Sequence, residues 1–394
     1  MNFFVMRRKD GTIFSWRSFE WEVVSVRRGL ILAIVSMVVL AFSVIKIGVV
    51  FPMTGNLSAV GEAAWNGIQI AHEEKPTVLG QEVKLILVDN RSEKAEAANA
   101  FSRLISKEKV VAIIGAMSSG NTLAGVPIAE ENGIPTISPW ATNPLVTQNR
   151  KFINRACFID PFQGAAAAVF AYKELGSRRV AIFMDVEQDY CVGLANFFYD
   201  KFTRLGGVAF KLFYRTGDQD FAAQIASAMQ LGVDTIYIPG YYTEAALIAR
   251  QARQMGFTGK LLAGDGVEFP ELVKIGGKAV EEMYFTTHYH PKGAATEVSK
   301  IFVKKYREKY GEDPSAAAAL AYDAYMMMLK AIEMAGEPDP VKIAQNIRKI
   351  KDFPGVTGYI TIDANGNAIK PVVVDVVKNG KFEFVKMIYP KDIQ

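Results

Sequence analysis

Short apolar runs alternate with longer amphipathic stretches along most of the chain. Apolar runs bounded by polar residues are typical of buried strands, and we expect strands at Ile47–Phe51, Val83–Asp89, Val110–Ile114, Pro135–Ser138, Arg179–Met184, Val208–Tyr214, Thr235–Ile238, Leu261–Ala263 and Met283–Thr286. The stretches between them predict helices at Glu93–Lys107, Gly164–Leu175, Val192–Leu205, Phe221–Leu231 and Thr243–Met255. This βαβα order predicts an α/β fold of doubly wound parallel sheets covered by helices.

After Ala295 the pattern changes to long helical stretches that are followed by strands. We expect three helices and two final strands here, at Thr296–Tyr310, Ala316–Ala335 and Val341–Ile350, and at Tyr359–Ile362 and Val372–Val377. The two strands are expected to flank a turn at Asp363–Asn367. The chain has too many βα units for one compact sheet, so we expect two α/β lobes.

Near the N-terminus, a basic pair precedes an apolar run of signal-peptide type. Arg27-Arg28 is followed by Gly29–Ile45, and Ala41-Phe42-Ser43 is an acceptable small-x-small cleavage site. The run is 17 residues long, which is at the lower limit for a membrane span. Either a signal peptide within residues 1–45 is cleaved, which gives a periplasmic or otherwise extracytoplasmic protein, or residues 29–45 anchor the chain in a membrane. We favour cleavage after Ser43.

Charge and cysteine content limit the possible partners. Residues 1–45 hold six basic and three acidic residues, so the rest of the chain holds 39 Lys and Arg residues against 38 Asp and Glu residues. This balance gives no electrostatic case for nucleic-acid binding. The two cysteines, Cys157 and Cys191, either form a disulfide in an oxidising compartment or are two buried thiols.

The segment Gly115-Ala116-Met117-Ser118-Ser119-Gly120-Asn121-Thr122 joins an expected strand to the start of a helix. Free backbone N–H groups and the helix dipole make such a turn an anion site. The spacing differs from that of a nucleotide-binding P-loop because Asn121 stands in place of the required Lys. The loop therefore suits a carboxylate better than a triphosphate, unless it is an ordinary turn that needs small residues.

Further polar and aromatic residues follow other expected strands. Ligands bind beyond the carboxyl ends of the strands in such sheets, and the candidates there are Ser119, Trp140, Ala141, Thr142, Tyr190, Tyr241 and Asp265. Their hydroxyl and backbone donors, one carboxylate and aromatic walls complement a zwitterion with an apolar side chain. Singly, each aromatic residue could be packing and Asp265 could be a turn residue, but the combination favours a site.

The sequence contains none of the common enzyme motifs that we considered. The three histidines, His72, His288 and His290, form no His-Glu-x-x-His helix, and no Gly-x-Ser-x-Gly elbow occurs. His288 and His290 could be a metal pair, but a zinc site needs further ligands. We therefore expect a protein that is not an enzyme and that has no metal or cofactor.

Seven short motifs make the chain similar to the leucine/isoleucine/valine-binding proteins of bacterial ABC importers, from about Lys46 to Tyr389. The motifs are Ile47-Gly48-Val49-Val50, Met53-Thr54-Gly55, Ile113-Ile114-Gly115-Ala116-Met117-Ser118-Ser119, Ile137-Ser138-Pro139-Trp140-Ala141-Thr142, Asp189-Tyr190, Gly240-Tyr241-Tyr242-Thr243-Glu244 and Gly264-Asp265-Gly266-Val267. The resemblance implies a type I periplasmic binding fold with three hinge crossings. It places lobe 1 at residues 46–159 and 288–371, and lobe 2 at residues 160–287 and 372–394.

The resemblance also implies roles for individual residues. Ser119 and Thr142 would bind a ligand α-carboxylate, and Asp265 would hold the α-ammonium with help from the carbonyl of Trp140. Tyr190 and Tyr241 would close over the ligand from the second lobe. Asp265 is one methylene shorter than the Glu that is often found in the family, a departure that bears on side-chain specificity.

The implied function is that of an extracytoplasmic substrate-binding protein. It would act as a monomer, bind an apolar, branched-chain-like α-amino acid in the interlobe cleft and deliver it to the membrane permease of an ABC importer. The alternatives are a membrane-anchored sensory ectodomain and a receptor for an amide or another small organic acid.

Overall fold

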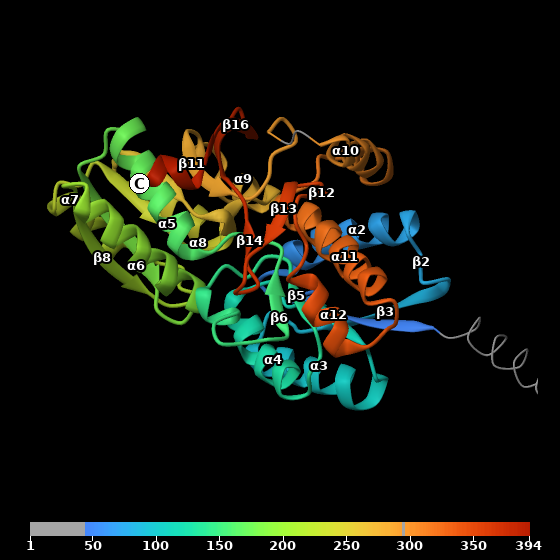
Figure 1. Ribbon diagram of the computed structural model, residues 1–394. Coiled ribbons are helices and arrows are strands. Elements are labelled where there is room, and N and C mark those ends of the chain that lie inside the picture. Colours follow the sequence, from blue (N-terminus) through green and yellow to red (C-terminus); the bar gives the residue numbers. More distant parts are fainter. Residues whose placement is uncertain (1–43, 294–295) are drawn as a thin grey trace, which may run out of the picture.

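The computed structural model describes residues 44–293 and 296–394. The small-x-small cleavage site and all of the predicted leader except Val44 and Ile45 lie outside these residues. The described part forms two α/β lobes, which lie side by side in Figure 1. None of the helices within these ranges combines the length and the apolarity needed to span a bilayer.

The first lobe is built on a six-stranded sheet with the order β2-β3-β1-β4-β5-β6. Its strands are β1 (Ile45–Phe51), β2 (Thr77–Val78), β3 (Gln81–Asp89), β4 (Ala112–Gly115), β5 (Thr136–Ser138) and β6 (Ile153–Arg155). The pairs from β3 to β6 are parallel, and β2 pairs antiparallel with β3. The helices between these strands are α2 (Ser58–Glu74), α3 (Lys94–Arg103) and α4 (Ser119–Glu131). Since β1 is buried along nearly its whole length, the sheet is covered on both faces.

The second lobe is built on a seven-stranded sheet with the order β16-β15-β11-β10-β9-β7-β8. Its strands are β7 (Arg179–Asp185), β8 (Val208–Tyr214), β9 (Thr235–Ile238), β10 (Lys260–Ala263), β11 (Met283–Thr287), β15 (Val372–Lys378) and β16 (Lys381–Ile388). The helices are α5 (Asp160–Val169), α6 (Asp189–Arg204), α7 (Ala222–Gln230), α8 (Tyr242–Gln254) and α9 (Pro270–Gly276). Strands β7 to β11 pair in parallel, whereas β15 and β16 are antiparallel additions from the C-terminal end of the chain.

After β11 the chain returns to the first lobe. It forms α10 (Glu297–Tyr310), α11 (Ala316–Ala335), α12 (Pro340–Ile347) and a small antiparallel sheet of β12 (Phe353–Gly355), β13 (Gly358–Ile362) and β14 (Ala368–Ile369). Helix α11 packs along α2 (Figure 1). A Cβ atom at Gly67 would lie 2.0 Å from the carbonyl oxygen of Ala318, so the absence of a side chain lets these two helices approach closely.

Shorter helical turns complete the fold. Two π-helical turns, at Leu104–Glu108 and Phe170–Glu174, extend α3 and α5, and 3-10 turns lie at Pro144–Val146, Asp265–Val267, Gly277–Val280 and Pro390–Ile393. The α/β class and the two doubly wound parallel-sheet lobes are thus confirmed.

The structure differs from the sequence-based elements near the C-terminus. The turn at Asp363–Asn367 is present, with the N–H of Gly366 donating to the carbonyl of Asp363 at 3.0 Å. Its flanking strands are β13 and β14, however, whereas Val372–Lys378 belongs to the other sheet. Pro371 separates β14 from β15, and a proline cannot continue a ladder of hydrogen bonds because it has no N–H.

Candidate functional site

A small cavity lies between the two sheets, beyond the carboxyl ends of their parallel strands. Its volume is about 10 Å³, which is the space for roughly one water molecule. The first lobe contributes Ser118, Ser119, Trp140 and Thr142 to its lining, and the second lobe contributes Tyr190, Tyr241 and Asp265. Six of the seven predicted site residues therefore surround one cavity.

The first-lobe side of the cavity is the N-terminus of α4. Ser119 is the first residue of this helix, and Ser118 precedes it, so the N–H groups of the first turn have no intrahelical acceptor. The Ser119 hydroxyl accepts a hydrogen bond from the N–H of Asn143 at 3.2 Å. The Thr142 hydroxyl is buried near the carboxyl group of Asp160, and it makes no hydrogen bond of ordinary geometry with a described residue. This side therefore offers hydroxyl and backbone donors to an anion.

Ala141 is the one predicted residue that does not line the cavity. Its carbonyl accepts from Nη1 of Arg155 at 2.5 Å, and the same guanidinium donates through Nη2 to the carbonyl of Asn143 at 2.8 Å. Arg155 is fully buried, and it fixes the backbone on both sides of Thr142. Sequence reasoning missed Arg155 because it lies on β6, a three-residue strand with no distinct apolar run.

Of the two alternatives for the cysteines, the structure shows two thiols rather than a disulfide. Cys157 and Cys191 are both buried and free. Cys157 lies beneath the same loop, with its Sγ 3.3 Å from the carbonyl oxygen of Ala141. Burial raises the pKa of the Cys157 thiol to about 12, so this thiol is protonated at neutral pH.

The second-lobe side of the cavity centres on the carboxylate of Asp265. Its Oδ1 accepts from the hydroxyl of Tyr190 and from Nε2 of Gln163, each at 2.7 Å, and its Oδ2 lies 3.0 Å from Nε2 of His288. An ionised carboxylate has about four acceptor positions, so these three partners leave one for a ligand. Gln163 and His288 were not predicted as site residues, and no motif in the sequence distinguishes them.

His288 is a neutral partner of Asp265. Its ring is buried and stacks on Phe158 with 3.7 Å between the ring centroids, and burial lowers its pKa. Because Nδ1 has no partner among the described residues, the tautomer that fits is the one whose Nε2–H donates to Asp265. Within the described residues, no group of three or more His, Cys, Asp or Glu side chains could hold a metal ion.

Aromatic rings form the remaining walls. Tyr241 lies 5.4 Å from Tyr190 and 6.2 Å from Trp140 between ring centroids, and Trp140 meets Phe269 edge-on at 5.9 Å. Burial raises the pKa of Tyr190 and of Tyr241, so both hydroxyls are protonated at neutral pH. The walls are therefore apolar apart from these hydroxyl groups.

Direct contacts hold the two lobes together around the cavity. Lys94 on α3 pairs with Asp189 on α6 at 2.6 Å, and the amide of Asn143 donates to the carbonyl of Asp189 at 3.0 Å. The hydroxyl of Tyr242 donates to the carbonyl of Asn56 at 2.6 Å. The structure is therefore a closed arrangement, and the lobes must separate for a molecule larger than water to enter.

The sequence matches a family model and known relatives. A family model described as periplasmic binding protein matches residues 44–381. A Leu/Ile/Val-binding protein homolog 2 of Brucella abortus is 30% identical over 350 residues, which are 87% of this chain and 92% of that protein.

Solved structures agree with the sequence relatives. A leucine binding protein, LivK, from Thermotoga maritima is 62% identical with a TM-score of 0.88, over 88% of this chain and 99% of that one. LivJ from Streptococcus pneumoniae, solved with isoleucine, is 34% identical with a TM-score of 0.83, over 88% of this chain and 100% of that one. A Rhodopseudomonas palustris solute binding protein solved with benzoate is 22% identical with a TM-score of 0.79, over 88% of this chain and 97% of that one, which shows a common fold.

Proposed function

Because this chain belongs to the periplasmic binding protein family, we propose that it binds an apolar α-amino acid of the branched-chain kind for an ABC importer. The family gives it an extracytoplasmic location and the role of a solute-binding protein rather than an enzyme. Relatives and solved structures named for leucine, isoleucine or valine binding support the ligand class.

One observation carries the proposal. The cavity presents hydroxyl and helix N-terminal donors from one lobe and the carboxylate of Asp265 from the other. An α-carboxylate would be held by Ser119, Thr142 and the first N–H groups of α4, and an α-ammonium by the remaining acceptor position of Asp265. Each ligand charge would then leave water for a matching partner, which offsets the cost of its burial.

The same carboxylate argues against a simple organic anion as the ligand. Benzoate would bring a carboxylate and no cation into a cavity that already contains Asp265, and two unmatched negative charges in a buried site repel each other. An amide receptor and a membrane-anchored sensory ectodomain remain the alternative functions, and neither has a specific feature of the cavity in its favour.

We propose residues 46–159 with 288–371 as lobe 1, and residues 160–287 with 372–394 as lobe 2. The membership of the strands in the two sheets supports these borders. Ligand in the cleft would stabilise the closed arrangement by a hinge motion. The closed monomer would then deliver the ligand to a membrane permease.

Calorimetric titration of the purified protein tests this function. The ligands are the twenty amino acids, simple amides and benzoate. We expect leucine, isoleucine or valine to bind most tightly and benzoate to produce no binding heat. Tight binding of benzoate or an amide, with no response to any amino acid, would overturn the proposal.

A further inference from the structure

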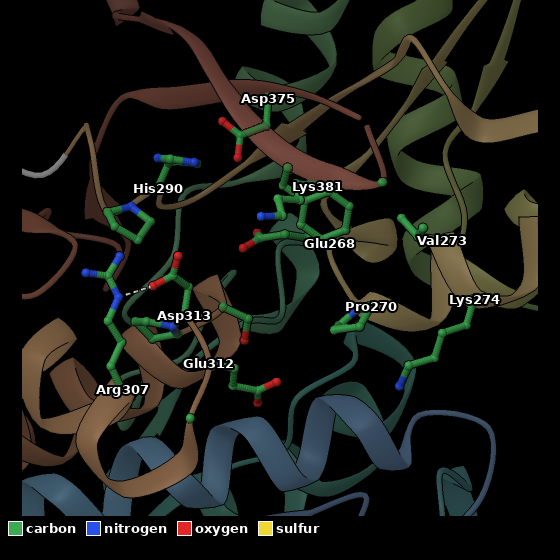
Figure 2. Close-up of a pocket in the computed structure, with 16 residues that line it drawn as sticks. Glu268, Pro270, Val273, Lys274, His290, Arg307, Glu312, Asp313, Asp375 and Lys381 are labelled. Carbon is green, nitrogen blue, oxygen red and sulfur yellow. Dashed lines mark hydrogen bonds and ion pairs between the residues drawn. The ribbon is translucent and has the colours of Figure 1, made fainter. Parts of the chain in front are cut away.

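A second and much larger cavity lies on another part of the molecule, and Figure 2 shows it. Its volume is about 800 Å³. The second lobe lines it from the start of α9 and from β15 and β16, and the first lobe lines it from residues 311–315, which connect α10 to α11. No residue of the amino-acid cavity contributes to this lining.

Asp375 is the most unusual residue of this cavity. It lies on β15 within the run Val372–Lys378, where its neighbours are valines. A shift in the pairing of β15 with β16 occurs between Val374 and Asp375, and such irregularities redirect side chains. Asp375 is 1% exposed, and its Oδ1 is buried with no hydrogen-bond partner among the described residues.

A buried carboxylate without a partner is costly. Removing its charge from water costs several kcal/mol unless a cation or several donors replace the water. Burial accordingly raises the pKa of Asp375 to about 9. A cation inside the cavity would supply the partner that the protein itself does not provide.

Glu268 adds a second carboxyl group to the same cavity. Its Oε1 accepts from the N–H of Ala316 at 2.9 Å, and its Oε2 accepts from the hydroxyl of Thr287. It is buried, and burial raises its pKa to about 8. Figure 2 shows the carboxyl groups of Asp375 and Glu268 both directed toward the interior of the cavity, and the charge of Glu268 contributes to the raised pKa of Asp375.

The other charged groups leave the cavity with an acidic excess. Its acidic side chains are Glu268, Glu312, Asp313 and Asp375, and its basic ones are Lys274, His290, Arg307 and Lys381. Arg307 pairs with Asp313, and Lys274 pairs with Glu271, which lies outside the lining. Burial lowers the pKa of His290, so its ring is neutral. Three acidic groups, Glu268, Glu312 and Asp375, therefore remain against one basic group, Lys381, which lies at the exposed start of β16.

We propose that this cavity binds a small organic ammonium ion, with the ammonium placed against the carboxyl groups of Asp375 and Glu268. The alkyl part of such a ligand would lie along the apolar lining, which includes Pro270, Val273 and Phe382. A second ammonium group would reach Glu312 on the first-lobe side. A ligand that joins the two sides would also stabilise their closed arrangement.

Titration of 1,4-diaminobutane into the full-length protein at pH 7 tests the proposal. We expect saturable binding at one site. Binding should release protons, because carboxyl groups with a raised pKa must ionise to pair with an ammonium. Calorimetry in two buffers that differ in ionisation enthalpy measures this release. The uncharged analogue 1,4-butanediol should not bind.

Three variants locate the site. Asp375→Asn and Glu312→Lys should each weaken diamine binding at least tenfold, and Glu312→Lys changes only an exposed side chain. Glu383→Gln is the matched control, because Glu383 is an exposed acidic residue of β16 that lies outside the cavity lining, and this variant should bind the diamine as the unchanged protein does. If the diamine does not bind, or if Glu312→Lys and a folded Asp375→Asn bind it normally, the proposal is wrong.

Discussion

At the scale of single residues, we expect substitution of Asp265 to cause the largest loss of affinity at the amino-acid site. We expect Asp265→Asn to weaken leucine binding by about 2–5 kcal/mol, the usual loss when one partner of a buried charge pair is removed. The partners of Asp265 include Tyr190 and Gln163, so its carboxylate is held in place before a ligand arrives. Calorimetry on the native and variant proteins measures the loss.

The ligand provides the control for this experiment. 4-Methylpentanoic acid is leucine without its amino group, so it should bind poorly to the native protein, which would bury Asp265 without an ammonium. The same acid should lose less affinity, or gain, in Asp265→Asn. The four titrations form a double-mutant cycle. If the binding free energy lost in Asp265→Asn and that lost on removal of the amino group simply add, Asp265 does not contact the ammonium.

Ser119 should matter less than Asp265. We expect Ser119→Ala to weaken leucine binding by about 1–3 kcal/mol, because the N–H groups at the start of α4 would still bind the carboxylate. The same titration measures this loss. A loss for Ser119→Ala larger than that for Asp265→Asn would contradict the proposed division of roles.

Buried carboxyl groups should also make stability depend on pH. Folding raises the pKa of Asp375 to about 9 from an ordinary value of about 4, so the native state binds more protons than the unfolded chain between these values. The free energy of unfolding must then fall as pH rises through this window. Asp160 and Glu268, whose pKa values burial raises to about 8, act in the same direction.

Asp375→Asn tests this dependence because the amide cannot ionise. We expect the variant to raise the free energy of unfolding at pH 8 by about 1–4 kcal/mol, with a gain that shrinks toward pH 5. Urea unfolding at both pH values measures the gain. Lys378→Gln, at an exposed position of β15 outside the cavity lining, is the control and should leave the dependence nearly unchanged. A variant that is equally destabilised at both pH values would show that the carboxyl group is held by a partner.

At the scale of elements, the close packing of α2 against α11 should be sensitive to a single methyl group. Gly67→Ala would place a Cβ 2.0 Å from the Ala318 carbonyl oxygen, so we expect a loss of about 1–3 kcal/mol in the free energy of unfolding. Denaturant unfolding measures it. Glu62→Ala, on the exposed side of the same helix, should change stability by less than about 0.5 kcal/mol.

The elements also show what the sequence could and could not predict. The sequence predicted the bounds of strands that are buried on both faces to within a few residues of those in the structure, because the apolar runs of such strands are continuous. Helix α2 was not among the expected helices, since its buried side includes Gly61, Ala64 and Gly67 and its apolar stripe is weak. Strand β16 was missed because its lysine, glutamate and phenylalanine residues alternate, as in a half-exposed edge strand.

The grouping of six candidate residues around one cavity has a similar explanation. Parallel sheets bring strand ends together, and five candidates lie two to five residues beyond such ends: Ser119, Thr142, Tyr190, Tyr241 and Asp265. Gln163, on α5, and His288, which follows β11, reach Asp265 only through tertiary packing. No local pattern in the sequence encodes such a contact.

At the scale of the whole molecule, closure of the two lobes is the central expectation. The closed cavity has a volume of about 10 Å³, far below the several hundred Å³ of typical ligand pockets, so binding must begin from an open arrangement. Leucine is larger than this cavity, so it should shift the population from the open arrangement toward a liganded closed form, in which the lobes close around a wider cavity than in this structure. Small-angle scattering should show a smaller radius of gyration at saturating leucine, and an unchanged profile would count against closure.

Tyr242 offers a way to weaken closure without touching the ligand. Its hydroxyl donates across the lobes to the carbonyl of Asn56 at 2.6 Å, and it does not line the amino-acid cavity. Tyr242→Phe removes only this contact, so we expect leucine affinity to fall by about 0.5–1.5 kcal/mol. The radius of gyration without leucine should stay the same or increase.

The exposed pair of Lys94 and Asp189 is the matched control. Both side chains are more than a third exposed, and such pairs contribute little because water and salt screen them. Lys94→Ala should therefore change leucine affinity by less than Tyr242→Phe does. If both variants bound leucine like the native protein while scattering still reported compaction, the ligand would drive closure through its own contacts with Ser119 and Asp265. The contacts between the lobes would then follow closure rather than stabilise it.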